Sequence, residues 1–175
     1  MKPTARRAAA SAGLMLTATV LAAGVPGPAT AAGRKAALPA AGAFTVGDVT
    51  FGAPESVKGD KCKLTVNGTL SFTGDVAGSA TGTTTAIVFA TCDDALVAAP
   101  GTYFDVFRFE GDFTGTVHGE AAEGTLVYAG VTQEGGDIDA RIRLRGEDAW
   151  ARLQTTDALV LQGGTFKGKA KKPTS

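Results

Sequence analysis

The sequence predicts an all-β fold: an antiparallel meander of about eight strands, closed into a barrel rather than folded as a sandwich, and preceded by a signal peptide. Apolar and polar residues alternate with a period of two along most of the 175-residue chain. Glycine-rich or acidic turns separate the alternating segments. No helical crossover of the length that a parallel sheet needs lies between these segments, so we expect each strand to pair antiparallel with its neighbour in sequence.

The alternation is clearest in 63–73 and 137–146, where apolar side chains fall on one face of a strand and polar or charged ones on the other. Further strands are expected at 44–51, 83–92, 102–113, 125–132, 149–155 and 158–166. The side chains expected to point inward include Leu64, Val66, Phe72, Phe107, Phe109, Ile138, Ile142 and Leu144. Eight strands enclose an interior that side chains just fill or that holds one small ligand, and the bulk of this set favours a filled interior.

The chain is expected to comprise a signal peptide (1–31), a flexible linker (32–43), the β-barrel domain (44–168) and a basic disordered tail (169–175). Lys2, Arg6 and Arg7 precede an apolar run, and Ala29-Thr30-Ala31 offers the small residues that a signal peptidase requires. An uncleaved anchor is the alternative, but the apolar run is short for a bilayer span and rich in alanine. We therefore expect a secreted protein without stable membrane insertion.

Charge is unevenly distributed along the sequence. The chain has 17 basic and 17 acidic residues, a formal net charge of zero. Three basic residues lie in the signal peptide, two in the linker and four in the last nine residues. The remaining body holds 8 basic residues against all 17 acidic ones, a net charge of −9. An acidic body argues against a nucleic-acid partner.

Two cysteines, Cys62 and Cys92, are expected to form a disulfide, since the protein is expected to be exported. A hairpin that places them face to face would turn near residue 77, within the turn-forming segment 75–79. They would then join the open ends of two paired strands. Two free or redox-active thiols are the alternative, but the chain has no C-x-x-C spacing.

His118 is the single histidine of the chain and a candidate for ligand binding or general-base chemistry, with Glu120 or Glu123 as its partner. The alternative is an exposed histidine in a turn. No Gly-x-Ser-x-Gly motif accompanies it. The acidic clusters match no calcium loop and sit where turns need solvated polar residues, so we expect neither a metal site nor a cofactor.

Arginines form the second candidate ligand site. Three of them alternate along one strand and the fourth follows after a turn: Arg141, Arg143, Arg145 and Arg152. Such a stripe suits a carboxylate, sulfate or phosphate group. The alternative is a solvated outer face whose arginines pair with acids such as Asp137 and Asp139.

A turn pattern, Phe-x-Gly-Asp-x-x-Gly, occurs at 72–78 and again at 109–115. The run 109–116, with the following 124–128, resembles small barrel proteins of the allene oxide cyclase-like class, among them uncharacterised bacterial domains with similar turns. The resemblance implies an eight-stranded antiparallel barrel with a lumen. It implies no catalysis, because no cyclase functional residue matches a position of this sequence.

These features favour a secreted, non-catalytic β-barrel that binds a small ligand, an envelope component or a protein partner. One alternative is a cyclase- or isomerase-like enzyme that works by positioning its substrate, with His118, Glu110 or Arg108 inside the lumen. The other is a secreted inhibitor or interaction module that engages a partner through a loop such as 93–101.

Overall fold

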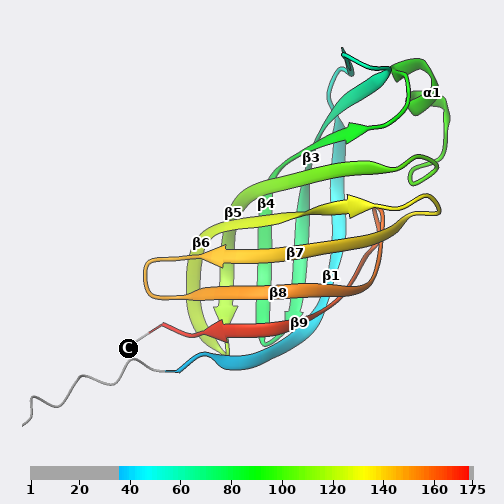
Figure 1. The fold of residues 1–175 in the computed structure, drawn as a ribbon. Coiled ribbons are helices and arrows are strands. Elements are labelled where there is room, and N and C mark those ends of the chain that lie inside the picture. Colours follow the sequence, from blue (N-terminus) through cyan, green and yellow to red (C-terminus); the bar gives the residue numbers. More distant parts are fainter. Residues whose placement is uncertain (1–35, 174–175) are drawn as a thin grey trace, which may run out of the picture. The chain divides into compact units, whose positions relative to one another are not determined.

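The computed structural model of the protein describes residues 36–173, and the expected signal peptide lies outside them. The elements are β1 (Leu38–Phe51), β2 (Glu55–Val57), β3 (Lys61–Gly74), β4 (Val76–Val88), α1 (Cys92–Val97), β5 (Asp105–Val117), β6 (Glu120–Thr132), β7 (Asp137–Arg145), β8 (Trp150–Leu159) and β9 (Gly163–Lys171). All strands but β2 form a ring in which β1 pairs with both β9 and β3 (Figure 1). The prediction of a closed antiparallel barrel of about eight strands is confirmed.

Aromatic side chains fill one end of the barrel, the end that carries the β3–β4 and β5–β6 turns; we call it the filled end. The ring of Phe72 lies 6.2 Å from that of Phe113 and 6.1 Å from that of Phe166, measured between centroids. All three side chains are at most 3% exposed. The residues expected to point inward either are buried in this core or line the interior further along the barrel. The expected filled interior is therefore correct for this end alone.

The barrel closes where β1 passes between β3 and β9. Gly42 lies opposite Gly74 on one side and Phe166 on the other. A Cβ atom at Gly42 would collide with the carbonyl oxygen of Thr73 and with the ring of Phe166. Only glycine therefore allows the strands to approach this closely.

The barrel domain is longer at both ends than the sequence predicted. β1 already begins at Leu38, inside the expected linker, and β9 continues to Lys171, inside the expected tail. The two ends pair with each other, and Ala40 and Ala170 are buried. The prediction of a flexible linker is thus wrong for 38–43, and the prediction of a disordered tail is wrong for 169–171. The small side chains of these segments fit a crowded strand pairing rather than a mobile segment.

The expected disulfide between Cys62 and Cys92 is confirmed, with 4.7 Å between the two Cα atoms, but the two cysteines do not face each other across a hairpin. The β3–β4 hairpin turns at Asp75, so Cys62 lies opposite Val88. Cys92 follows the hairpin as the first residue of α1. The bond therefore ties α1 to the start of β3.

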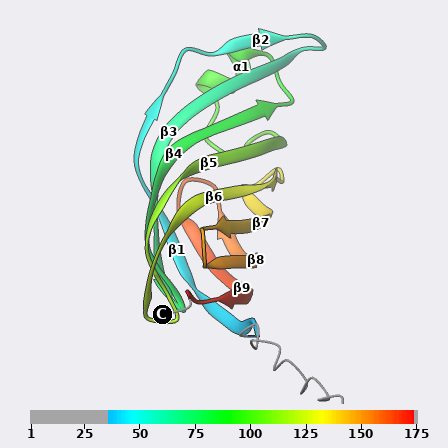
Figure 2. The same ribbon diagram turned by 90° about the vertical axis from the view of Figure 1, so that its left-hand side faces the viewer.

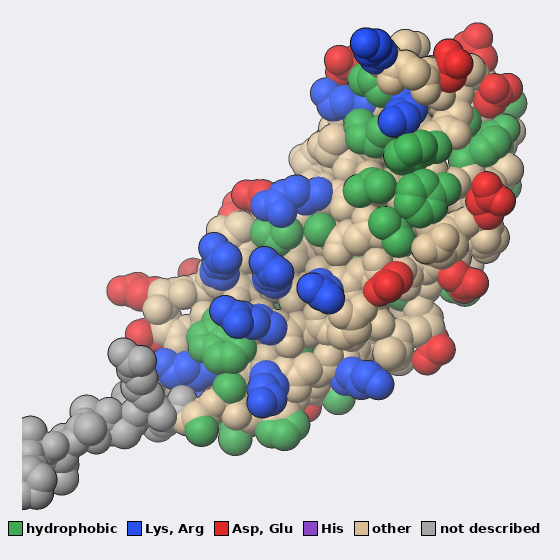
Figure 3. All heavy atoms as spheres, in the orientation of Figure 1, with side chains coloured by type: hydrophobic (Ala, Val, Ile, Leu, Met, Phe, Trp, Pro, Cys, Tyr) green, Lys and Arg blue, Asp and Glu red, His purple; other side chains and the backbone are tan. Residues whose placement is uncertain are grey.

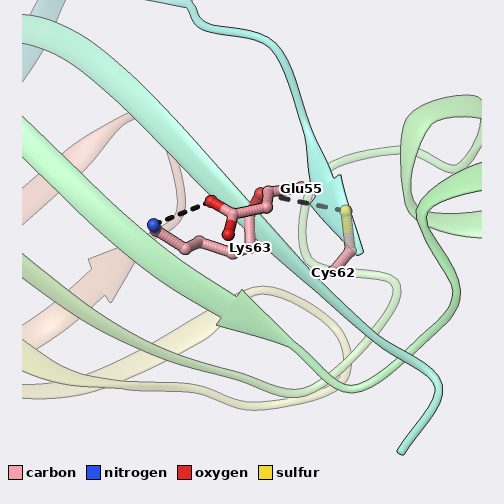
Figure 4. Close-up of polar contacts among 3 residues, drawn as sticks. All are labelled: Glu55, Cys62 and Lys63. Atoms are coloured by element: carbon pink, nitrogen blue, oxygen red, sulfur yellow. Dashed lines mark hydrogen bonds and ion pairs between the residues drawn. The ribbon is translucent and has the colours of Figure 1, made fainter. Parts of the chain in front are cut away.

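The short strand β2 extends the sheet beside this disulfide. An ion pair of 2.9 Å joins Lys63 Nζ on β3 to Glu55 Oε2 on β2, and Figure 4 shows Cys62 next to it. The disulfide, the ion pair and β2 all lie at the end of the barrel opposite the filled end; we call it the open end (Figure 2).

Candidate ligand-binding site

A cavity of about 420 Å³ lies at the open end of the barrel. Its walls are inward-facing side chains of the strands together with residues 95–103, the segment that begins in α1 and leads to β5 (Figure 1). Most of the lining is apolar and includes Val46, Leu64, Val66, Ala86, Phe107, Ile138 and Leu161. A concave, mainly apolar site of this volume has the dimensions of a small-molecule pocket.

The cavity wall combines small and large inward side chains. On β4 the inward positions here include Thr84 and Ala86, both small, whereas the neighbouring strand β5 presents Phe107 and Phe109 to the cavity and Phe113 to the filled end. The segment 95–103 contributes further small residues, Ala95, Ala98 and Ala99, to the wall. One period-two pattern therefore produces a filled end and an open end, because the pattern sets the face but not the bulk of each side chain.

Polar side chains interrupt the apolar lining at seven positions: Thr69, Thr84, Thr102, Tyr103, Asp105, Tyr128 and Thr132. Asp105 on β5 lies directly opposite Thr132 on β6. Asp105 Oδ1 and the Tyr128 hydroxyl are buried and have no hydrogen-bond partner among residues 36–173. A buried polar atom without a partner costs about 1–3 kcal/mol, so a ligand that bonds to either oxygen gains affinity here.

Burial perturbs both acids of this group. It raises the pKa of Asp105 to about 6, although a hydrogen bond with Thr132 opposes the rise. Burial, and secondarily the charge of Asp105, also raises the pKa of the Tyr128 hydroxyl. Among the described residues that line the cavity, none is a lysine, an arginine or a histidine. These residues therefore offer a ligand one carboxyl and several hydroxyl groups, but no cation.

Asp105 is expected to make the stability of the protein depend on pH. Its pKa is about 6 in the folded state against 3.8 for an unperturbed aspartate, so the folded state holds this proton more tightly. The free energy of unfolding therefore loses the contribution of Asp105 as pH rises from about 4 to about 6. The variant Asp105→Asn should match the wild type near pH 4 and exceed it in stability near pH 8, as measured by urea denaturation.

The matched control for this comparison is Asp112→Asn, since Asp112 lies exposed on the outer face of the same strand. A stability difference between Asp105→Asn and the wild type that stays constant from pH 4 to pH 8 would contradict the assignment.

His118 lies at the filled end, away from the cavity. It occupies the β5–β6 turn with φ 52° and is only 14% exposed in its side chain. Its Nδ1 is 3.6 Å from Asp75 Oδ1, and its backbone N–H donates to the Asp75 carbonyl. The prediction that Glu120 or Glu123 is the partner of His118 is wrong. The alternative of an exposed histidine is also wrong, because the β5–β6 turn packs against the β3–β4 turn.

The four candidate arginines lie outside the barrel. Arg141, Arg143 and Arg145 project from the outer face of β7, and Arg152 on β8 lies directly opposite Arg143. Neither they nor His118 line the cavity. The structure thus separates the predicted ligand-binding residues into an outer surface and a turn.

Arg108 and Glu110, the lumen candidates of the enzyme alternative, also lie on the outside. They form an ion pair of 2.7 Å on the outer face of β5 and are more than half exposed. Sequence reasoning found apolar residues of the lumen, among them Leu64 and Ile138, but missed its polar residues Asp105 and Tyr128. Asp105 lies two residues before Phe107, on the same face of the strand, and this period was the signal that could have found it.

The chain matches no protein-family model and no curated protein. Within residues 36–173, no helix is both long and apolar enough to cross a membrane. The same residues contain no cluster of histidine, cysteine and acidic side chains that would hold a metal ion.

Proposed function

We propose that the protein is a secreted, non-catalytic β-barrel that binds a small, mainly apolar ligand in the cavity at its open end. The observation that carries this proposal is the pairing of a mainly apolar cavity of about 420 Å³ with two buried oxygen atoms, on Asp105 and Tyr128, that lack hydrogen-bond partners in the described part of the chain. Pockets that bind small molecules combine apolar walls with a few such polar groups.

The chemistry of the cavity indicates the class of ligand. At roughly 30 Å³ per non-hydrogen atom, the share of one water in the liquid, the cavity has room for about 14 such atoms, and a somewhat larger ligand can extend out through the open end of the barrel. The carboxyl of Asp105 and the hydroxyl of Tyr128 suit a ligand with a hydroxyl or an amine. An anionic head group would lie beside a carboxylate with no compensating cation, so we expect neutral or cationic ligands to be preferred.

Binding without catalysis is favoured by what lines the cavity. Serine, cysteine, histidine and lysine, which often serve as nucleophiles and bases, do not occur among the described residues that line the cavity. A cyclase- or isomerase-like reaction would have to rest on Asp105 and on the tyrosine and threonine hydroxyls of the lining. Secretion is supported by the disulfide, which persists in oxidising compartments, together with the predicted signal peptide.

The test is a titration with N-phenylnaphthylamine, a neutral fluorescent probe with one N–H group whose emission rises in apolar surroundings. We expect saturable binding at micromolar concentrations and displacement by decanol and decylamine. Decanoate, which has the same chain length but an anionic head group, should displace the probe at least about tenfold less well near pH 8.

The two parts of the proposal fail separately in this experiment. Absence of saturable binding by any of these compounds would contradict the function. Equal or better displacement by decanoate would leave the binding function in place and contradict the ligand class.

A further inference from the structure

Seven basic side chains share the outer face of β7, β8 and β9. They are Arg141, Arg143, Arg145, Arg152, Lys167, Lys169 and Lys171. Figure 3 shows Lys and Arg side chains gathered over these strands. We call this surface the basic face.

The strand register places like charges directly opposite one another. The central row of the basic face runs from Arg143 on β7 to Arg152 on β8 and Lys169 on β9. Like charges in directly opposite positions of a sheet are destabilising. This row therefore reduces the stability of the barrel unless an anion lies over it.

The cations of the basic face are not paired with carboxylates of the described residues. None of the seven side chains forms an ion pair within residues 36–173. Arg141 bonds to Gln154, at 3.3 Å, and it is the amide of Gln154 that donates to Asp139. The alternative expected from the sequence, a solvated outer face whose arginines pair with acids such as Asp137 and Asp139, is thus correct for the exposed face and wrong for the pairing. Gln154 bridges Arg141 and Asp139 instead.

The strands on either side of the basic face are uncharged at the matching outward positions. On β6 the residues opposite the arginines are Thr125, Val127 and Ala129, and on β1 the residues opposite the lysines are Pro39 and Ala41. The described residues hold 12 basic against 17 acidic side chains, so this part of the chain carries a net negative charge. Gathering seven of the 12 basic residues on three strands creates a local positive potential against that background.

We propose that the basic face binds a linear polymer with repeating phosphate groups. Alternate residues of a strand are about 6.8 Å apart and neighbouring strands about 4.8 Å apart. The seven cations therefore occupy a regular grid, interrupted on β8 by Trp150 and Gln154, rather than a single anion pocket. Arginine binds phosphate oxygens through two parallel hydrogen bonds. A hollow of about 290 Å³ among Arg143, Arg145, Trp150 and Arg152 gives room for one such group.

A polymer fits the basic face better than a membrane does. Binding to a bilayer surface combines basic with inserted apolar side chains. The large apolar side chain among the cations is Trp150, and the guanidinium of Arg152 lies over its ring, 5.5 Å from the centroid. Two of its cross-strand neighbours are basic as well, Arg145 and Lys171.

The test compares polyphosphate binding by the wild type and by the variant Arg143→Gln/Arg152→Gln/Lys169→Gln. The matched control removes three charges from the other end of the protein, in Lys58→Gln/Lys61→Gln/Lys63→Gln. We expect the first variant to bind inorganic polyphosphate at least about tenfold more weakly and the control to bind like the wild type. The slope of log affinity against log salt should fall by up to about one for each removed charge.

A second readout separates this outcome from misfolding. Because the triple glutamine variant removes like-charge repulsion, its midpoint of urea denaturation should be equal to or higher than that of the wild type. Equal loss of binding in the control, or no binding of polyphosphate by the wild type, would overturn the proposal. Binding of vesicles rich in anionic lipid without binding of polyphosphate would overturn it in favour of a membrane surface.

Discussion

The substitution Ala86→Trp is expected to weaken binding of N-phenylnaphthylamine about 100-fold while the barrel stays folded. Ala86 faces the cavity from the middle of the open end, between Leu64 on β3 and Phe107 on β5. An indole at this position occupies space that the ligand needs. Displacing about ten ligand atoms, at about 0.3 kcal/mol each, removes about 3 kcal/mol of binding free energy, which corresponds to about 100-fold in the dissociation constant.

The neighbouring residue provides the control. Thr85 precedes Ala86 on β4 but points outward and is exposed, so Thr85→Trp adds an indole of the same size outside the cavity. We expect this variant to bind the probe like the wild type, and far-ultraviolet circular dichroism to show both variants folded. Equal affinity of Ala86→Trp and the wild type would show that the probe binds elsewhere.

Removal of the disulfide, in the variant Cys62→Ala/Cys92→Ala, is expected to lower the free energy of unfolding by about 3–4 kcal/mol. The cross-link closes a loop between positions 30 residues apart, and the chain-entropy model assigns that much to a loop of this length. The bond also fixes the first residue of α1, and the next turn of α1 contributes Ala95 and Leu96 to the cavity wall. The variant is therefore also expected to bind the probe less tightly.

Reduction provides the control for this prediction. A reducing agent should lower the stability of the wild type by a similar amount and leave that of Cys62→Ala/Cys92→Ala unchanged, as followed by urea denaturation. A loss below about 1 kcal/mol in both experiments would show that the disulfide contributes little to folding.

The all-β class and the face of most strands could be predicted because both depend on local alternation. The residues expected inward, from Leu64 to Leu144, all lie on the inner side of the barrel. Local alternation also indicates an inward position for Asp105, but the charge of this residue argued for an outward one. The ends of the barrel were missed at Ala40 and Ala170, because the pairing that buries these small residues joins the two ends of the chain.

The cavity could not be predicted, because it depends on which inward side chains share one level of the barrel. That level is set by strand register, and register depends on turn geometry. The β3–β4 hairpin turns at Asp75 instead of residue 77, which moves the partner of Cys62 by four residues, from Cys92 to Val88. Bulges such as the one that includes Asp157 on β8 shift the register further.

The most direct test of ligand binding inside the barrel is the methyl nuclear magnetic resonance spectrum of the wild type, recorded with and without N-phenylnaphthylamine. The cavity predicts that the largest chemical-shift changes fall on Leu64, Val66 and Ile138, which line it. Val117 at the filled end and Val127 on the outer face of β6 should change little. Changes centred on Val127, or no change at saturating probe, would contradict a ligand site in the open end of the barrel.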